Sequence, residues 1–172
     1  MLFSKSLLNL ILYIQIMIQR KQSIFLLLVV VMMSWTVVRP YAQLVLKDGS
    51  ALVFNGFGIE KHVTMLGIEY IKYTVPLFLL ILLTGSLNLV NIFLFSRRIV
   101  QIRLSIVSAV LLVFITLTML YYYILARYSY DYSFHTYRLA AIFPLIGIIM
   151  NFLAFRGINH DEALVKSYDR IR

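Results

Sequence analysis

The sequence contains no cysteine, which excludes disulfides, thiolate nucleophiles, cysteine-ligated metals and iron–sulfur clusters. It also carries little charge, since 13% of its 172 residues are charged, against about 25% in a typical soluble domain. Because 62% of the residues are hydrophobic, too few polar side chains remain to cover a water-exposed surface. The composition therefore predicts a membrane protein.

Acidic residues are scarce: 7 Asp and Glu stand against 16 Lys and Arg, a formal net charge of +9. In a soluble protein this balance would suggest a nucleic-acid partner. Here the basic residues flank apolar segments, and the positive-inside rule accounts for them. No basic run alternates with aromatic residues as single-strand binding grooves require, so no nucleic-acid partner is expected.

Four apolar segments lack Asp, Glu, Lys, Arg and His altogether. At 1.5 Å per residue, the run Val75–Phe95 makes a helix about 31 Å long, which matches the hydrocarbon core of a bilayer. The sequence predicts an all-α membrane protein, a four-transmembrane-helix bundle with spans near residues 22–38, 74–95, 104–125 and 139–155. The absence of ionisable groups in these spans argues against a proton or ion relay.

The two central spans are separated by a short basic segment containing Arg97, Arg98 and Arg103. Each arginine would cost roughly 2.5–3.5 kcal/mol at bilayer depth, so the segment is expected to be a turn outside the lipid. Ten Lys and Arg lie on the side of this turn, which predicts that it and both termini are cytoplasmic.

The residues from Tyr41 to Tyr70 form the largest predicted loop, on the extracytoplasmic side. Asp48-Gly49 within QLVLKDGSALVF is typical of a hairpin with a type I′ turn. The predicted register places four residues on one face: Leu44, Leu46, Ala51 and Val53. Beyond this small β-hairpin, three glycines are expected to break up the loop: Gly56, Gly58 and Gly67.

Tyrosines cluster at the end of the third predicted span and in the loop after it, at Tyr121, Tyr122, Tyr123, Tyr128, Tyr130, Tyr132 and Tyr137. Such a cluster is typical of an interfacial aromatic belt that fixes the depth of a helix. Binding of a quinone, a sterol or a sugar is the alternative interpretation.

Thr84, Asn88 and Asn91 follow one another at i, i+4 and i+7, which places them on one helical face of the second span. Interhelical hydrogen bonding is the simpler interpretation of this possible intramembrane polar face. A polar lining for a lipid, small molecule or ion is the alternative.

After Arg156-Gly157, the segment NHDEALVKSYDRIR predicts a short amphipathic C-terminal helix with Asn159 as its N-cap. Its acidic residues are candidates for pairing with the basic turn. The resulting possible site for a lipid headgroup or partner comprises Arg97, Arg98, Gln101, Arg103, Asp161, Glu162 and Asp169.

The remaining candidates for chemistry are three histidines, His62, His135 and His160, which all lie outside the predicted spans. Haem ligation in a bundle needs histidines that face each other within the helices, and zinc needs more ligands than these segments supply. No nucleophile–base arrangement is visible. We therefore expect no catalytic residue, no metal and no cofactor.

Three segments carry a resemblance to a known family: MIQRKQSIFLLL from Met17, FLFSRRIVQIRL from Phe93 to Leu104, and RGINHDEALVKSYDRIR from Arg156. The chain from residue 17 to 172 resembles the domain of unknown function 4293, a family of small four-span bacterial integral membrane proteins. The resemblance implies a single membrane domain over 17–172 in the bacterial inner membrane, with residues 1–16 as an N-terminal extension. It implies no activity or ligand.

These observations lead to the expectation of a non-enzymatic membrane protein that acts as an accessory subunit, assembly factor or scaffold. Its expected partners are membrane lipids and either another membrane protein or a second copy of itself. The alternative is a lipid- or small-molecule-handling protein that uses the polar face of the second span.

Overall fold

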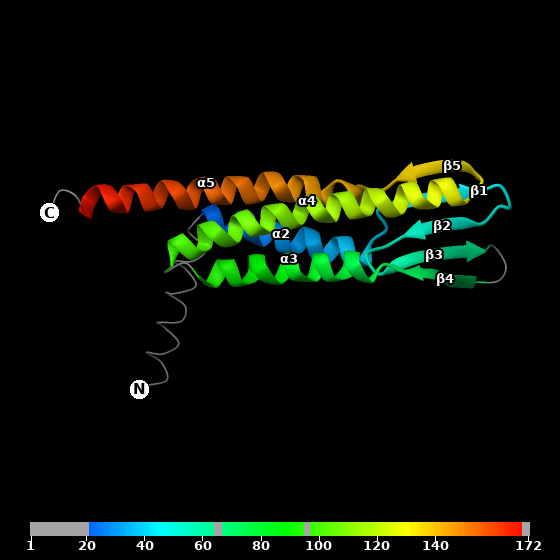
Figure 1. Cartoon of the computed structure of the whole chain (residues 1–172), viewed down its shortest axis with the longest axis horizontal. Coiled ribbons are helices and arrows are strands. Elements are labelled where there is room, and N and C mark those ends of the chain that lie inside the picture. The colour runs from blue at the N-terminus through cyan, green and yellow to red at the C-terminus, as the bar shows by residue number, and fades with distance from the viewer. Residues whose placement is uncertain (1–20, 64–66, 95–96, 170–172) are drawn as a thin grey trace, which may run out of the picture.

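The computed structural model describes residues 21–63, 67–94 and 97–169, with side chains described up to residue 162. The predicted N-terminal extension, residues 1–16, lies outside this part. The described chain forms helices and an antiparallel sheet that extends from one end of them (Figure 1).

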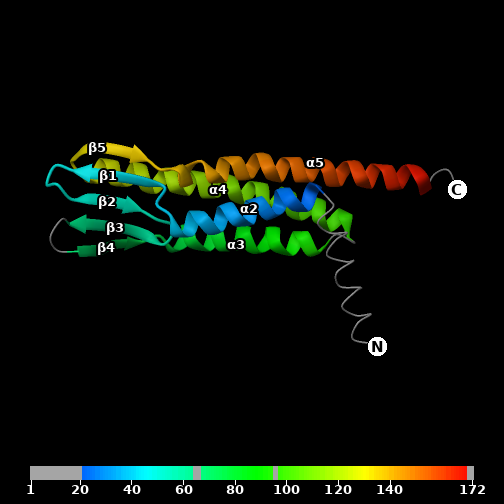
Figure 2. The same ribbon diagram turned by 180° about the vertical axis from the view of Figure 1, so that it is seen from behind.

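Helices account for most of the described chain. They are α2 (Lys21–Val38), α3 (Val75–Phe93), α4 (Arg98–Ser129) and α5 (Phe143–Asp169), with a short 3-10 helix η1 (Leu139–Ala141) before α5. α2 packs against α3 and α5, and α4 packs against the same two helices. Figures 1 and 2 show α5 extending beyond the other helices at the end away from the sheet.

The sheet has five strands in the order β4-β3-β2-β1-β5, and every neighbouring pair is antiparallel. Its strands are β1 (Ala42–Leu46), β2 (Ala51–Phe54), β3 (Gly58–Val63), β4 (Gly67–Tyr73) and β5 (Tyr132–Tyr137). The predicted all-α bundle of four transmembrane helices is therefore wrong. In the described residues, α3 and α4 are the two helices long and apolar enough to cross a membrane.

We did not predict strands β3, β4 and β5, because their sequences do not show the alternation of apolar and polar residues that is typical of a half-buried strand. Residues 58–73 carry charged side chains and glycines, and β5 lies among tyrosines that were assigned to a short loop. These strands form because their backbone groups hydrogen-bond to neighbouring strands. Such hydrogen bonds do not require an apolar pattern along each strand. β5 pairs with β1 across a long sequence separation.

The predicted hairpin is present, but its turn differs from the expected type I′. Only Gly49 has a positive φ, of 81°, and the Gly49 N–H donates to the carbonyl of Leu46 at 3.2 Å. The Leu46 N–H donates to the carbonyl of Ser50 at 2.8 Å. This is a type I turn followed by a left-handed glycine, which closes a three-residue loop with a bulge.

The extra loop residue reverses the face of the second strand. Leu44 pairs with Leu52, and the buried face consists of Ala42, Leu44, Leu46, Leu52 and Phe54. Ala51 and Val53, which were predicted to share a face with Leu44, lie on the opposite face. A register change of one residue moves every side chain of a strand to the other face.

The last two helices also differ from their predicted bounds. α4 begins six residues earlier than expected and continues past the tyrosines to Ser129, over 32 residues. α5 runs without interruption through Gly157 to Asp169, so the separate tail helix capped by Asn159 was a wrong prediction. A Cβ at Gly157 would lie 2.8 Å from Gln22 Cγ. The glycine therefore allows α2 to approach α5 closely and does not end the helix.

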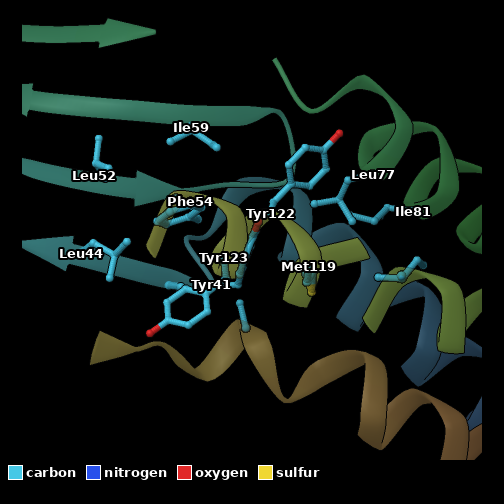
Figure 3. Close-up of a cluster of buried hydrophobic side chains, with 14 of the residues drawn as sticks. Tyr41, Leu44, Leu52, Phe54, Ile59, Leu77, Ile81, Met119, Tyr122 and Tyr123 are labelled. Atoms are coloured by element: carbon cyan, nitrogen blue, oxygen red, sulfur yellow. The ribbon is translucent and has the colours of Figure 1, made fainter. Parts of the chain in front are cut away.

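The hydrophobic core continues from the helices under the sheet. The C-terminal turns of α4 cover its buried face, where the rings of Phe54 and Tyr123 lie 6.2 Å apart between centroids (Figure 3). Tyr122 and Tyr123 are buried here, whereas Tyr121 and Tyr128 are exposed. The predicted aromatic belt is therefore wrong for the two buried tyrosines, which belong to the core.

Candidate functional site

The predicted polar face of α3 lies inside the protein, where Thr84, Asn88 and Asn91 are at most 1% exposed. Asn88 Nδ2 donates to Ser108 Oγ at 2.5 Å and to the Thr84 carbonyl at 2.8 Å. Asn91 Nδ2 donates to Ser105 Oγ at 3.0 Å. These contacts join α3 to α4 by interhelical hydrogen bonds.

Two other residues complete this buried polar cluster. Asn151 of α5 donates from Nδ2 to the same Ser108 Oγ at 2.7 Å, and Gln101 of α4 donates from Nε2 to the Asn91 carbonyl at 2.9 Å. Sequence reasoning missed the serines. Their spacing was the available signal, because Gln101, Ser105 and Ser108 repeat the i, i+4, i+7 pattern found on α3.

The cluster holds no titratable side chain, so it cannot transfer protons. Its amides are buried between helices, which does not favour the alternative of an open polar groove for a lipid or small molecule. The Oδ1 atoms of Asn88, Asn91 and Asn151 have no hydrogen-bond partner within the described residues. The arrangement fixes the mutual positions of α3, α4 and α5.

The predicted site at the basic turn is assembled only in part. Arg98 Nη1 donates to the backbone carbonyl of Asp161 at 2.9 Å, so the start of α4 and the late part of α5 do lie together. Asp161 Oδ2 instead accepts from Gln22 Nε2 at 2.7 Å. Gln101 is buried in the polar cluster, whereas Arg97 and Arg103 are exposed.

Two further acidic residues of the predicted site, Glu162 and Asp169, lie later on α5. Glu162 is half-buried, and the side chain of Asp169 lies outside the described side chains. Among the predicted residues, Arg97 and Arg103 are the exposed cations, and their role in binding an anionic headgroup stays a prediction.

At the opposite end, the turn between β1 and β2 is held by its own carboxylate. Asp48 Oδ1 accepts from the Ser50 hydroxyl at 2.7 Å and from the Ser50 N–H at 3.0 Å, while Lys61 Nζ lies 3.3 Å from Oδ2. The Ser50 side-chain and backbone hydrogen bonds lower the pKa of Asp48 from 3.8 to about 2. The carboxylate is thus a capping group of the turn.

The histidines of the sheet have local partners. His62 Nε2 lies 3.2 Å from Glu60 Oε2, and Glu60 also accepts from Asn55 Nδ2 at 2.8 Å. His135 packs against the rings of Tyr132 and Tyr137. In the ranges that the structure describes, no group of three or more His, Asp or Glu side chains is arranged to hold a metal ion.

Another feature that the sequence did not indicate is the outer edge of the sheet at β4. β4 is the last strand on its side, and all seven of its residues are exposed. Ile68 and Tyr73 are 61% and 67% exposed, and the rings of Tyr70 and Tyr73 stack at 5.6 Å. An edge strand offers unpaired backbone groups to another strand, and apolar side chains add to that tendency.

Comparison with curated proteins gives no match to this chain. A family model matches residues 18–171, which include all the described residues and, apart from Met17 and Arg172, the three segments that carried the resemblance. The resemblance is thereby confirmed: the chain belongs to the family described as domain of unknown function (DUF4293).

Proposed function

We propose that this chain is a non-enzymatic membrane protein that acts as an accessory subunit, assembly factor or scaffold, and that it binds a protein partner along strand β4. The observation that carries the proposal is the full exposure of this edge strand together with its large apolar side chains. A partner strand that adds to the sheet would gain backbone hydrogen bonds and would cover these side chains.

The distribution of polarity in the helices supports a position in the membrane. α3 and α4 bury the polar side chains of the cluster described above, and they expose large apolar ones outward, such as Leu82, Phe114 and Leu117. In water these exposed side chains would form an extended apolar surface of the kind that monomeric soluble proteins avoid. In a membrane the acyl chains of the lipids would contact this apolar surface, so no protein partner would be needed to bury it.

We further propose that α3 and α4 cross the bacterial inner membrane as a hairpin whose basic turn is cytoplasmic. Arg97, Arg98 and Arg103 lie at the helix ends remote from the sheet, so the positive-inside rule places the sheet on the extracytoplasmic side. The start of α2 and the end of α5 point to the same side as the turn (Figure 1). Both termini are then cytoplasmic.

The difference in helix length fits this placement. α3 has 19 residues and a length of about 28 Å, close to the thickness of the hydrocarbon core. α4 has 32 residues and a length of about 48 Å, so its last turns extend beyond the lipid. Those turns support the sheet, which holds β4 away from the membrane and accessible to a partner.

The test is site-specific photocrosslinking in native membranes. A benzophenone amino acid is placed at Tyr70 in the full chain, and the matched control carries it at Tyr128, which is exposed but lies on α4. We expect one defined protein adduct from Tyr70 and none from Tyr128, each identified by mass spectrometry. Ile68→Lys should lower the yield from Tyr70 about tenfold, because a charged residue disfavours strand addition at an edge.

Adducts to lipid alone from Tyr70 would contradict a partner at β4. An adduct between two copies of this chain would show that β4 mediates self-association, and would contradict binding of a different protein. A yield that Ile68→Lys leaves unchanged would show that β4 is not the binding strand.

A further inference from the structure

A second feature of the structure is independent of the sheet edge. A cavity of about 150 Å³ lies where α4 meets the start of β1, and it is lined by Tyr41, Thr116, Met119, Leu120, Tyr123 and Tyr137, with small residues between them. Figure 3 shows Tyr41, Tyr123 and Met119 grouped at this junction of sheet and helices. An engineered apolar cavity of this size holds one benzene molecule, so the space suits a single ring.

Two buried hydroxyls at this cavity lack partners. Tyr41 and Tyr123 are 2% and 4% exposed, and neither phenolic oxygen has a hydrogen-bond partner within 3.5 Å in the described part of the chain. After burial, the Tyr137 side chain is the next cause that raises the pKa of Tyr123 to about 12, so Tyr41 is the better isolated of the two hydroxyls. The third hydroxyl of the lining is already satisfied, because Thr116 Oγ1 donates to the Leu112 carbonyl at 2.9 Å. A buried hydroxyl without a partner is unfavourable, so the two phenols indicate a ligand with acceptor oxygens.

The backbone holds Tyr41 rigidly in this position. Its N–H donates to the Phe54 carbonyl at 2.9 Å, and its own carbonyl accepts from the Arg138 N–H at 3.0 Å. Burial, with a smaller effect of Tyr122, raises the pKa of Tyr41, so its hydroxyl remains a donor at neutral pH.

The lining contains no charged side chain, which favours a neutral ligand. Leu120 and Tyr137 are exposed at the cavity, and Leu120 belongs to the apolar outer surface of α4. With α4 in the membrane, as proposed above, a ligand would enter from the outer part of the lipid layer.

We propose that this cavity binds the oxygen-bearing ring of a neutral, membrane-soluble molecule of the quinone class, with the hydroxyls of Tyr41 and Tyr123 donating to its oxygens. The site involves residues distinct from those of strand β4. Its failure would leave the partner proposal intact, and the reverse also holds.

The probe for this site is duroquinone, compared with durene, which has the same ring and methyl groups but no oxygen. Dissociation constants are measured by ligand-observed NMR on the purified full chain at a fixed detergent concentration. We expect Tyr41→Phe and Tyr123→Phe each to weaken duroquinone binding about five- to tenfold and to leave durene binding unchanged, because each removes one hydrogen bond.

A second pair of variants locates the binding. Thr116→Leu fills the cavity and should abolish binding of both probes. Thr118→Leu is the matched control, since Thr118 makes the same hydrogen bond to its own helix but does not line the cavity. Equal binding to these two variants would place the probes elsewhere and overturn the proposal.

Equal affinity of the native chain for duroquinone and durene would also overturn the proposal, since the hydroxyls would then play no part. Thermal unfolding without probe gives an independent measurement. Tyr41→Phe should not lower the midpoint, because the hydroxyl has no partner to lose. A clear decrease would show that the fold itself satisfies this hydroxyl, and would contradict the assignment.

Discussion

At the scale of single residues, the buried polar cluster stands out because it places neutral amides where a soluble protein would place apolar side chains. Ser108 is its centre, since its Oγ accepts from both Asn88 and Asn151. Ser105 accepts only from Asn91 among the hydrogen bonds of this cluster. The two serines therefore allow a comparison between an acceptor of two hydrogen bonds, Ser108, and an acceptor of one, Ser105.

Ser108→Ala should destabilise the protein more than Ser105→Ala, because it removes one acceptor from each of two buried amides, those of Asn88 and Asn151. We expect a loss of about 1–3 kcal/mol for Ser108→Ala and about 0.6–2 kcal/mol for Ser105→Ala. Thermal or denaturant unfolding in detergent measures both, with the exposed Ser86→Ala as the control. A larger effect of Ser105→Ala would refute the central role of Ser108.

The turn carboxylate gives a prediction about pH. Since the folded pKa of Asp48, about 2, lies below its ordinary value of 3.8, its contribution to stability is present above pH 3.8 and is lost as the pH falls toward 2. Ser50→Ala should return the pKa of Asp48 toward 3.8, and Lys61→Met should change it less, because Ser50 is the larger cause. Carboxyl ¹³C titration by NMR measures both variants. A larger change in Lys61→Met would contradict this order of causes.

At the scale of secondary-structure elements, short-range geometry decided the register of the sheet. The same two apolar runs form a hairpin with either type of turn. The type I turn with its left-handed glycine moves the second strand by one residue relative to the type I′ alternative. The position of Leu52 and Phe54 in the core therefore depends on the conformation of Gly49.

Gly49→Ala should destabilise the sheet by about 1 kcal/mol, because its φ of 81° is unfavourable for a residue with a Cβ although nothing crowds the position. Gly49→Asn should cost less, since asparagine tolerates this conformation. Unfolding midpoints in detergent provide the comparison. Gly85→Ala in α3, which also meets no neighbour, is the control and should not destabilise. If Gly49→Ala were neutral, the bulged turn would be wrong.

At the scale of the whole molecule, the helices and the sheet differ in where their polar and apolar side chains lie. The helices bury a polar cluster and expose a mainly apolar surface, whereas the covered face of the sheet is apolar and the ion pair of Lys47 and Asp131 lies at its exposed end. This change in polarity along the long axis is what a boundary between lipid and water would require. It supports the placement of the sheet outside the membrane.

Because the chain has no cysteine, single introduced cysteines can report its orientation. Lys47→Cys at the sheet end should react with a membrane-impermeant maleimide in spheroplasts, whereas Arg97→Cys at the basic turn should react only after the membrane is opened. Both positions are exposed, so neither is hidden by the fold. Labelling of both from the same side would refute a membrane-crossing hairpin.

Sequence alone predicts the family, the apolar helices α2 and α3 nearly to their observed bounds, and the pairing of β1 with β2. These features depend on local composition, on a continuous apolar run, and on the turn at Asp48-Gly49. It also indicated the polar face of α3, because helical spacing alone places Thr84, Asn88 and Asn91 together.

The remaining features arise from contacts between distant parts of the chain. β3, β4 and β5 exist because backbone groups pair across the sheet, and β5 meets β1 only after α3 and α4 have brought it back. The close approach of α2 to Gly157 of α5 and the surroundings of the Tyr41 and Tyr123 hydroxyls are likewise tertiary features. The physical reason is the same in each case: pairing and burial between residues distant in the chain leave no pattern in the local sequence.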